Sequence, residues 1–184
     1  MRVAGGQFKG RKLKTVSGLF TRPTTDKIRQ SIFNILMNDI EDKDVLDLFA
    51  GSGALGIEAL SRGADSATFV ENGHRQVEIL KGNLVSLELP KSIVKLDYKS
   101  ACQKLHDENR QFDLIFADPP YEKYLPDQIA ETVHQYNLLR QNGFLILEHK
   151  TGEQVKDDRF VLIKARKFGQ TEVTFYVRKE DDLR

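Results

Sequence analysis

The sequence has little that would suit an oxidising compartment, a membrane or a metal site. It holds one cysteine, Cys102, among 184 residues, which excludes an internal disulfide framework and suits a reducing cytoplasm. No run of about 18 apolar residues occurs, so no membrane-spanning helix is expected. The opening stretch MRVAGGQFKG lacks the apolar core of a secretory signal. The four histidines are scattered without metal-ligand spacing. We therefore expect a cytoplasmic protein without a metal ion.

The charge is distributed unevenly although the net charge is only +1. Residues 1–29 hold eight basic side chains and one acidic side chain, which gives +7 and leaves −6 for the remainder. Six of the basic side chains fall within residues 1–22, where no acid occurs: Arg2, Lys9, Arg11, Lys12, Lys14 and Arg22. Such a segment favours a polyanionic partner, and we expect these six to bind RNA phosphates. The alternatives are a solvated surface or a structural flap over a cofactor cleft.

The glycines of this basic segment predict a thin β-ribbon that contributes little to a cofactor pocket. Pro23 follows, and the apolar spacing from Ile28 to Leu36 predicts a helix. Strand and helix patterns then alternate. The expected strands are 45–49, 66–70, 93–96, 112–117 and 144–147, and the expected helices are 53–61, 74–87, 100–106 and 126–136. Alternation of this kind is typical of a parallel sheet covered by helices on both faces.

The end of the chain departs from the alternation. Two strand patterns, 160–164 and 172–178, flank a turn at Gly169 with no helix between them, so they should pair antiparallel. The sequence therefore predicts an α/β fold: a doubly wound, mainly parallel seven-stranded sheet that ends in an antiparallel hairpin. This is the outline of S-adenosylmethionine-dependent methyltransferases. The expected division is a β-ribbon arm at 1–22 and the methyltransferase domain at 23–184.

The stretch DLFAGSGALG could bind either of two nucleotide-bearing cofactors. Gly51, Gly53 and Gly56 form the G-x-G-x-x-G pattern of dinucleotide-binding proteins, and Glu71 follows where a ribose partner is expected. Asp47, four positions before the first glycine, separates the two readings. An anion there disfavours a pyrophosphate and tolerates a positively charged sulfonium. The loop therefore favours S-adenosylmethionine over NAD.

Three successive strands each deliver a carboxylate to one edge of the sheet. Glu71, Asp97 and Asp118 follow the second, third and fourth expected strands, and ligands of open α/β sheets bind at the carboxyl ends of the strands. A nucleoside needs acceptors for its ribose hydroxyls and for its adenine amine. Glu71 is placed for the ribose and Asp97 for the amine.

The sequence ADPPY is the most specific motif of the chain. Pro119 and Pro120 leave two peptide nitrogens without a proton, and the Pro119 carbonyl with the Asp118 carboxylate offers two acceptors to one planar NH₂ group. Tyr121 offers a face on which a base can stack. Bonds from both N–H groups would free the nitrogen lone pair for attack on a methyl sulfonium. The motif indicates methyl transfer to an exocyclic amine by positioning and electrostatics.

The chain resembles the RsmD family, bacterial methyltransferases of the 2-amino group of a guanine in 16S ribosomal RNA. The resemblance runs nearly end to end. It includes RVAGGQFKGRKL as the basic hairpin, RPTTDKIRQSIFNIL as the first helix, DLFAGSGALGIEALSRGA as the cofactor loop with its helix, DPPY, and KFGQTEVTFY as the closing hairpin. The resemblance implies S-adenosylmethionine as cofactor and 16S ribosomal RNA as partner, free or within the small ribosomal subunit. A monomer is expected.

The resemblance also implies roles for particular residues. The implied cofactor site comprises Asp47, Phe49, Gly51, Ser52, Gly53, Glu71, Asn72, Asp97 and Thr24. The implied target-base site comprises Asp118, Pro119, Pro120 and Tyr121. Thr24 and Arg22 stand where the first helix meets either the cofactor or the RNA, and the sequence leaves both readings open.

Three other functions remain open. Many amino-methyltransferases have Asn where this chain has Asp118. A carboxylate is a stronger acceptor than an amide and could also take up the released proton, so the identity of the target base is open. The nearest rivals methylate adenine in DNA or RNA, or a protein glutamine amide. A small-molecule dehydrogenase would need a substrate domain that the sequence lacks. A ribosome-binding module without catalysis would not need the cofactor and amine motifs.

Overall fold

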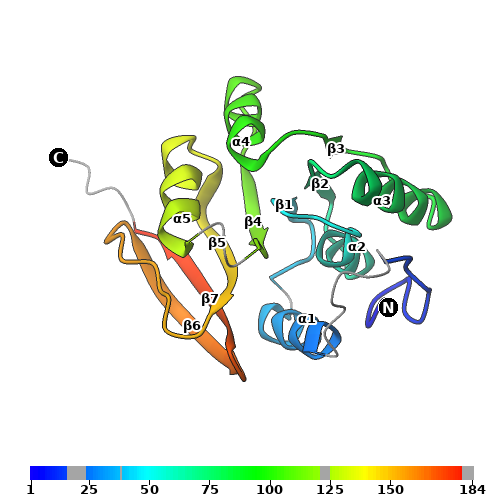
Figure 1. Ribbon diagram of the computed structural model, residues 1–184, viewed down its shortest axis with the longest axis horizontal. Coiled ribbons are helices and arrows are strands. Elements are labelled where there is room, and N and C mark those ends of the chain that lie inside the picture. The colour runs from blue at the N-terminus through cyan, green and yellow to red at the C-terminus, as the bar shows by residue number, and fades with distance from the viewer. Residues whose placement is uncertain (16–23, 38, 121–124, 180–184) are drawn as a thin grey trace.

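The structure is a computed structural model that describes residues 1–15, 24–37, 39–120 and 125–179, with the main chain alone for Thr24 and Thr25. The described part contains five helices and seven strands (Figure 1). In chain order they are α1 (Thr24–Leu36), β1 (Asp44–Asp47), α2 (Ala54–Ser61), β2 (Ser66–Val70), α3 (His74–Ser86), β3 (Ile93–Val94), α4 (Tyr98–Asp107), β4 (Phe112–Ala117), α5 (Pro126–Gln135), β5 (Leu139–Lys150), β6 (Phe160–Phe168) and β7 (Thr171–Arg178).

One seven-stranded sheet organises the protein, in the order β3-β2-β1-β4-β5-β7-β6. The strands β1 to β5 pair parallel, and β7 pairs antiparallel with both β5 and β6. The predicted mainly parallel sheet with a closing hairpin is confirmed. The chain runs outward from β1 to β3 and then returns to β4, so the strand order reverses between β1 and β4. A crevice forms at the carboxyl ends of the strands at such a reversal.

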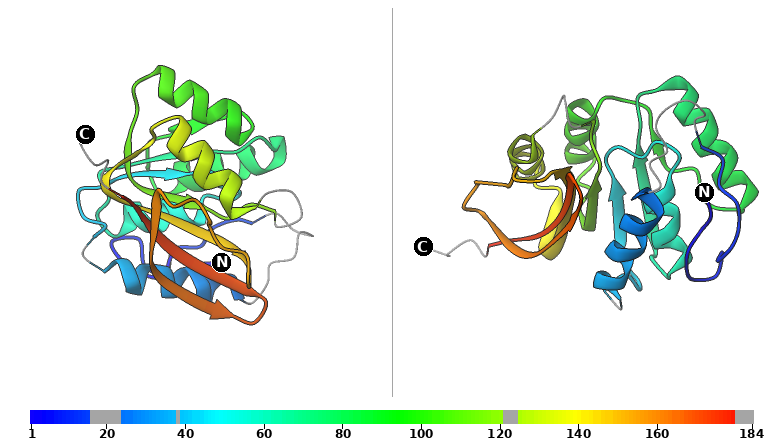
Figure 2. Two further views of the ribbon diagram at one scale, coloured as in Figure 1. Left: turned by 90° about the vertical axis from the view of Figure 1, so that its left-hand side faces the viewer. Right: turned by 60° about the horizontal axis from the view of Figure 1, so that its bottom comes forward.

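Helices cover both faces of the sheet, as Figures 1 and 2 show. Alternate residues of each strand point to opposite faces. Val45 therefore packs into the core under α1, α2 and α3, and Leu46 packs into the core under α4 and α5. Phe33 of α1 contacts Phe116 of β4, with ring centroids 5.7 Å apart. Cys102 lies on the buried face of α4, where burial raises the pKa of its thiol to about 12.

Strand β5 differs most from its predicted bounds of 144–147. It spans Leu139–Lys150, with Leu139 paired to Phe112 and the segment from Phe144 onward paired to β7. The polar stretch Arg140–Asn142 hid the first part, because an apolar run alone marked the strand. Asn142 adopts a left-handed φ of 62°, which accompanies the irregular register near Asp113.

The described part of the basic segment, residues 1–15, docks on the rest of the protein beside α2 and α3 (Figure 2). Val3 and Leu13 are buried in the core that α1, α2 and α3 share. The predicted ribbon is present as one antiparallel bridge between Arg2 and Lys12. Gly6, at a φ of 72°, passes so close to α2 that a Cβ would lie 1.7 Å from the Ser61 carbonyl oxygen. The expected domain boundary at residue 22 lies outside the described residues.

Candidate functional site

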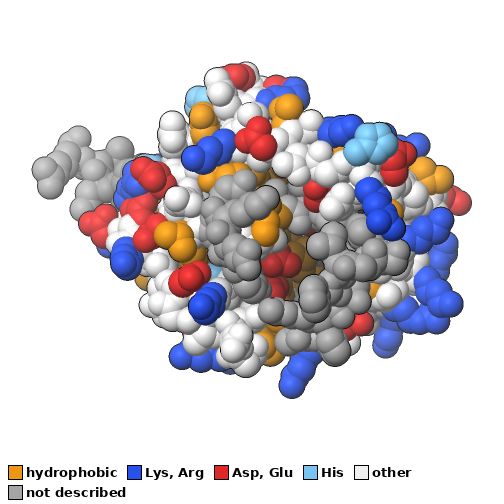
Figure 3. All heavy atoms as spheres, viewed as in Figure 1, with side chains coloured by type: hydrophobic (Ala, Val, Ile, Leu, Met, Phe, Trp, Pro, Cys, Tyr) orange, Lys and Arg blue, Asp and Glu red, His pale blue; other side chains and the backbone are white. Residues whose placement is uncertain are grey.

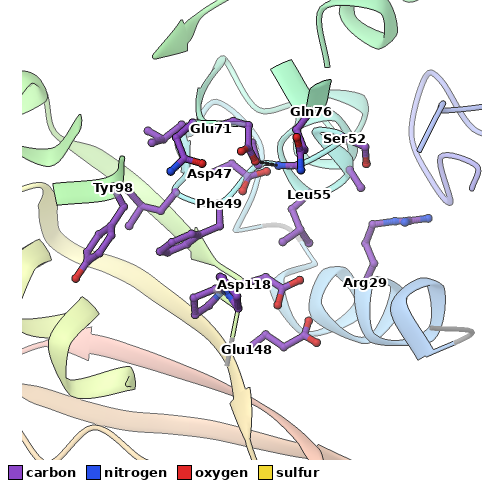
Figure 4. A pocket seen from close by; sticks show the side chains of 18 of the residues that line it. Arg29, Asp47, Phe49, Ser52, Leu55, Glu71, Gln76, Tyr98, Asp118 and Glu148 are labelled. Carbon is purple, nitrogen blue, oxygen red and sulfur yellow. Dashed lines mark hydrogen bonds between the residues drawn. The ribbon is translucent and has the colours of Figure 1, made fainter. Parts of the chain in front are cut away.

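A cavity of about 590 Å³ opens at the crevice between β1 and β4, within the usual size range of small-molecule sites. The hollow faces the viewer in Figure 3. Figure 4 shows side chains around it, which come from both sides of the point between β1 and β4 where the strand order reverses. Nine of the predicted site residues line it: Asp47, Phe49, Gly51, Ser52, Glu71, Asn72, Asp118, Pro119 and Pro120. The structure thus brings the glycine loop and the DPP sequence to one cavity.

Glu71 fixes the glycine loop at one wall of the cavity. One of its carboxylate oxygens accepts a 2.9 Å hydrogen bond from the Gly51 N–H, and the other accepts a 2.7 Å bond from the Gly73 N–H. Gly53 adopts a φ of 83°, and a Cβ there would lie 2.4 Å from the Leu80 side chain. The residue following this turn starts α2. Each Glu71 oxygen keeps a second lone pair, so the carboxylate can hold the loop and still accept bonds from a ligand.

Asp47 is a buried carboxyl group at the base of the same loop, with 1% of its surface exposed. Burial raises its pKa from 3.8 to about 7, and the charge of Glu71 adds to the increase. A 3.2 Å bond from the Gly56 N–H opposes the increase. The group therefore changes charge near neutral pH, and a cation in the cavity would favour its ionised form.

An apolar wall lies beside the ends of β1 and β3. Phe49 and Tyr98 contact each other with ring centroids 5.3 Å apart, and Leu96 lines the cavity with 38% of its surface exposed. A flat apolar surface next to a carboxylate suits the base and the ribose of a nucleoside. Tyr98 and Leu96 were missed in the sequence because their only signal is their place after a strand.

The opposite wall carries Asp118, Pro119 and Pro120 after β4, together with Glu148 of β5. Asp118 and Glu148 extend in the same direction, toward α1 (Figure 4). Glu148 was not among the predicted residues. Its signal is an acid that follows the fully buried run Leu145–Leu147, at the end of a strand where ligand-binding groups gather.

Five residues predicted for the cofactor, the target base or the start of the first helix stand elsewhere or outside the description. Gly53 belongs to the glycine loop but is not among the residues that line the cavity. Asp97 begins α4 as its N-cap, where its carboxylate accepts bonds from the Lys99 and Ser100 N–H groups and from the Ser100 hydroxyl. These bonds hold its pKa below the ordinary value. The adjacent Leu96 and Tyr98 line the cavity, so a role in adenine binding remains a prediction. Tyr121, Arg22 and the Thr24 side chain lie outside the described residues.

Arg29 was counted with the basic side chains of residues 1–29, but the structure buries it. Only 3% of its surface is exposed. It pairs with Glu58 at 3.4 Å and with Asp26 at 3.0 Å, and it donates to the Arg2 carbonyl at 2.6 Å. This guanidinium therefore ties α1 to α2 and to residues 1–15, and does not face a partner on the surface.

The other basic side chains of residues 1–15 are exposed, and blue side chains gather near this segment in Figure 3. Their backbone is held firmly. The Ala4 N–H donates to Glu58 and the Lys14 N–H to Asn83, both at 2.8 Å. Two residues of this segment, Met1 and Thr15, line the cavity; that the segment contributes little to cofactor binding stays a prediction.

The charge of the cavity is mainly negative. Among the described side chains that line it, four are acidic, Asp47, Glu71, Asp118 and Glu148, and one is basic, Arg29. The described residues contain no group of three or more His, Cys, Asp or Glu side chains that could hold a metal ion. They also contain no helix long and apolar enough to cross a membrane.

The negatively charged lining of the cavity suits a cationic or donor-rich ligand and opposes a pyrophosphate.

Comparison with known proteins places this geometry in a family. The family model described as "Conserved hypothetical protein 95" matches residues 1–177. "Putative rRNA methyltransferase YlbH" of Bacillus subtilis is 38% identical over 97% of this chain and 100% of its own length. "Ribosomal RNA small subunit methyltransferase D" of Haemophilus influenzae is 32% identical over 96% of this chain and 93% of its own.

A solved structure agrees with these relatives. "Putative methyltransferase yhhF from Escherichia coli" superposes with a TM-score of 0.85 at 32% identity, and covers 98% of this chain and 99% of its own. The end-to-end match includes the glycine loop, the DPP sequence and the N-terminal segment. The chain therefore belongs to the Conserved hypothetical protein 95 family, which is the RsmD family of methyltransferases.

Proposed function

We propose that this protein transfers a methyl group from S-adenosylmethionine to the 2-amino group of a guanine in 16S ribosomal RNA. The observation that carries the proposal is that the glycine loop and Glu71 line the same cavity as Asp118 and Pro119. A nucleoside cofactor on the first wall and an amine on the second would meet within this cavity, so binding alone would bring donor and acceptor together.

The residues of the first wall fit S-adenosylmethionine. Glu71 has lone pairs for the ribose hydroxyls, and Phe49 and Leu96 offer an apolar surface to adenine. The acidic lining favours a positively charged sulfonium over the pyrophosphate of NAD. When bound, the cofactor supplies an electrophilic methyl group.

The residues of the second wall would hold the amine. The Asp118 carboxylate and the Pro119 carbonyl accept its two N–H bonds, and we propose that Tyr121 stacks on the base. Accepting both bonds favours a tetrahedral nitrogen with a free lone pair. As the amine gains positive charge, the Asp118 carboxylate stabilises that charge and can then take up the proton.

The relatives' names support ribosomal RNA as the substrate. One is named a methyltransferase of small-subunit ribosomal RNA and another an rRNA methyltransferase. The exposed basic side chains of residues 1–15 are proposed to bind RNA phosphates. We further propose that the protein acts in the cytoplasm as a monomer, on free RNA or on the assembled small subunit.

Two variants at one position test the proposal. Asp118→Ala should abolish single-turnover methyl transfer while leaving the affinity for S-adenosylmethionine, measured by calorimetry, near that of wild type. Asp118→Asn keeps one acceptor of the same shape and should retain part of the rate. Near-normal transfer by Asp118→Ala, or calorimetric preference of the wild type for NAD, would contradict the proposal.

A further inference from the structure

Glu148 is an acidic side chain of the cavity to which the proposed function gives no role, and it lies on the wall of the target amine rather than in the glycine loop. It lies on β5, which pairs parallel with β4, and Ala117 stands opposite Leu147 in this register. Asp118 follows Ala117 directly after β4, and Glu148 follows Leu147 within β5. The register therefore places Asp118 and Glu148 at neighbouring positions at the ends of β4 and β5, and both line the cavity.

The alternation of side chains gives both carboxylates the same direction. Phe116 and Ile146 belong to the core under α1, α2 and α3, whereas Ala117 and Leu147 belong to the core under α4 and α5. The next residues of each strand return to the α1 side, where both line the cavity. Figure 4 shows Asp118 and Glu148 extending together toward α1. An amine bound at Asp118 therefore has a second acceptor next to it.

A second acceptor beside the amine distinguishes guanine from the other amine-bearing targets. In guanine the 2-amino group stands next to N1–H, which is a donor. In adenine the 6-amino group stands between N1 and N7, and in cytosine the 4-amino group stands next to N3; all of these are acceptors. In a glutamine amide the neighbour is a carbonyl oxygen. A carboxylate pairs with a donor and repels an acceptor lone pair.

We infer that Glu148 selects guanine by accepting its N1–H while Asp118 and Pro119 hold its 2-amino group. This inference rests on the proposed function, because it names how the same site recognises its base. The Watson–Crick edge of guanine would then meet a row of acceptors: the Pro119 carbonyl, the Asp118 carboxylate and the Glu148 carboxylate. Adenine or a glutamine amide in the same place would set a lone pair against the Glu148 carboxylate.

The experiment changes the donor on the base and the acceptor on the protein. The substrate is 16S ribosomal RNA in which the modified guanine, first mapped with the wild-type protein by mass spectrometry, is replaced through ligation by 2-aminopurine. This base keeps the 2-amino group but carries an acceptor at N1. Initial kcat/KM for both RNAs is measured with wild type, Glu148→Gln and Glu148→Ala. The matched control is Glu131→Gln, which makes the same chemical change at an exposed position of α5.

Wild type should prefer guanine over 2-aminopurine by roughly tenfold to hundredfold, the value of one hydrogen bond to a charged group. Glu148→Gln should lower turnover of guanine by roughly tenfold and reduce or reverse that preference, because the amide can donate to the N1 acceptor. Glu148→Ala removes both the bond to N1–H and the repulsion of the N1 acceptor, so it should reduce the preference, with a smaller gain on 2-aminopurine than Glu148→Gln. The missing O6 of 2-aminopurine affects every variant alike, so the change in preference reports on N1.

Two different results would separate failure of this inference from failure of the proposed function. If the wild type forms no N2-methylguanosine, the proposed function fails before Glu148 is tested. If the wild type does so and both Glu148 variants keep its preference for guanine, the inference about Glu148 is wrong. A cofactor affinity equal to that of wild type shows that each variant is folded.

Discussion

The buried carboxyl group of Asp47 should make the free energy of unfolding depend on pH. Its pKa is raised by burial from 3.8 to about 7, and this difference corresponds to about 4 kcal/mol. The folded protein therefore keeps the proton up to about pH 7, whereas the unfolded chain releases it near pH 4. The contribution of Asp47 to the free energy of unfolding should fall as pH rises between these values and stay constant above them.

Asp47→Asn removes this dependence while keeping the shape of the side chain. The variant also weakens the bond from the Gly56 N–H, a loss of about 1–2 kcal/mol. Above pH 7 we expect the variant without cofactor to be more stable than wild type by about 2 kcal/mol. Below pH 4 the order should reverse. Urea denaturation at several pH values measures both. If the free energy of unfolding depends on pH in the same way in both proteins, burial does not keep Asp47 protonated, which refutes the prediction.

If S-adenosylmethionine is the cofactor, the affinity for it should depend on pH through the same carboxyl group. S-adenosylmethionine carries a sulfonium and S-adenosylhomocysteine does not. The preference of the wild type for the charged ligand should therefore increase from pH 6 to pH 8, as Asp47 ionises. The increase should disappear in Asp47→Asn. Both ligands are titrated by calorimetry at each pH. If the ratio of their affinities does not change with pH in the wild type, Asp47 does not interact with the charge of the cofactor.

Three further predictions follow from the site and the N-terminal segment. Glu71→Ala should lower the affinity for S-adenosylmethionine, measured by calorimetry, roughly tenfold or more, and Glu71→Gln should lower it less. An unchanged affinity would exclude a role of Glu71 in ribose binding. Replacing the four basic side chains between positions 9 and 14 by alanine should flatten the salt dependence of RNA binding from a log–log slope near −3 if about four phosphates are contacted; an unchanged slope with weaker cofactor binding would support the structural flap. Glu58→Gln leaves Arg29 without its buried partner and should cost about 3 kcal/mol of unfolding free energy, whereas Glu108→Gln in an exposed pair with Lys104 should cost less than about 1 kcal/mol.

The sequence was sufficient for the topology of the sheet and for those residues at its strand ends that belong to a recognisable motif. Short apolar runs and turn glycines marked β2 (Ser66–Val70) and β4 (Phe112–Ala117) at their true bounds, because both strands are buried on both faces. The glycine loop, Glu71 and the DPP sequence were found because each has a local signal. These local signals fall at the ends of adjacent strands, so the cavity followed from the topology.

Long-range contacts were beyond such reasoning. Arg29 reads as one more surface cation in the sequence, and only the packing of α1 on α2 brings it to Glu58. Glu148 has no motif, and its role depends on the register between β4 and β5. The N-terminal segment reads as a free basic ribbon, yet Val3 and Leu13 anchor it in the core. In each case the partner lies far away in the chain.

The most direct test of the central claim is the identity of the methylated nucleoside. The purified protein is incubated with methyl-labelled S-adenosylmethionine and 16S ribosomal RNA or small subunits from cells that lack it, and the RNA is digested to nucleosides for mass spectrometry. We expect the label in N2-methylguanosine at a single position, and no label with Asp118→Ala. Label in N6-methyladenosine or in protein, or no transfer to either substrate, would contradict the account.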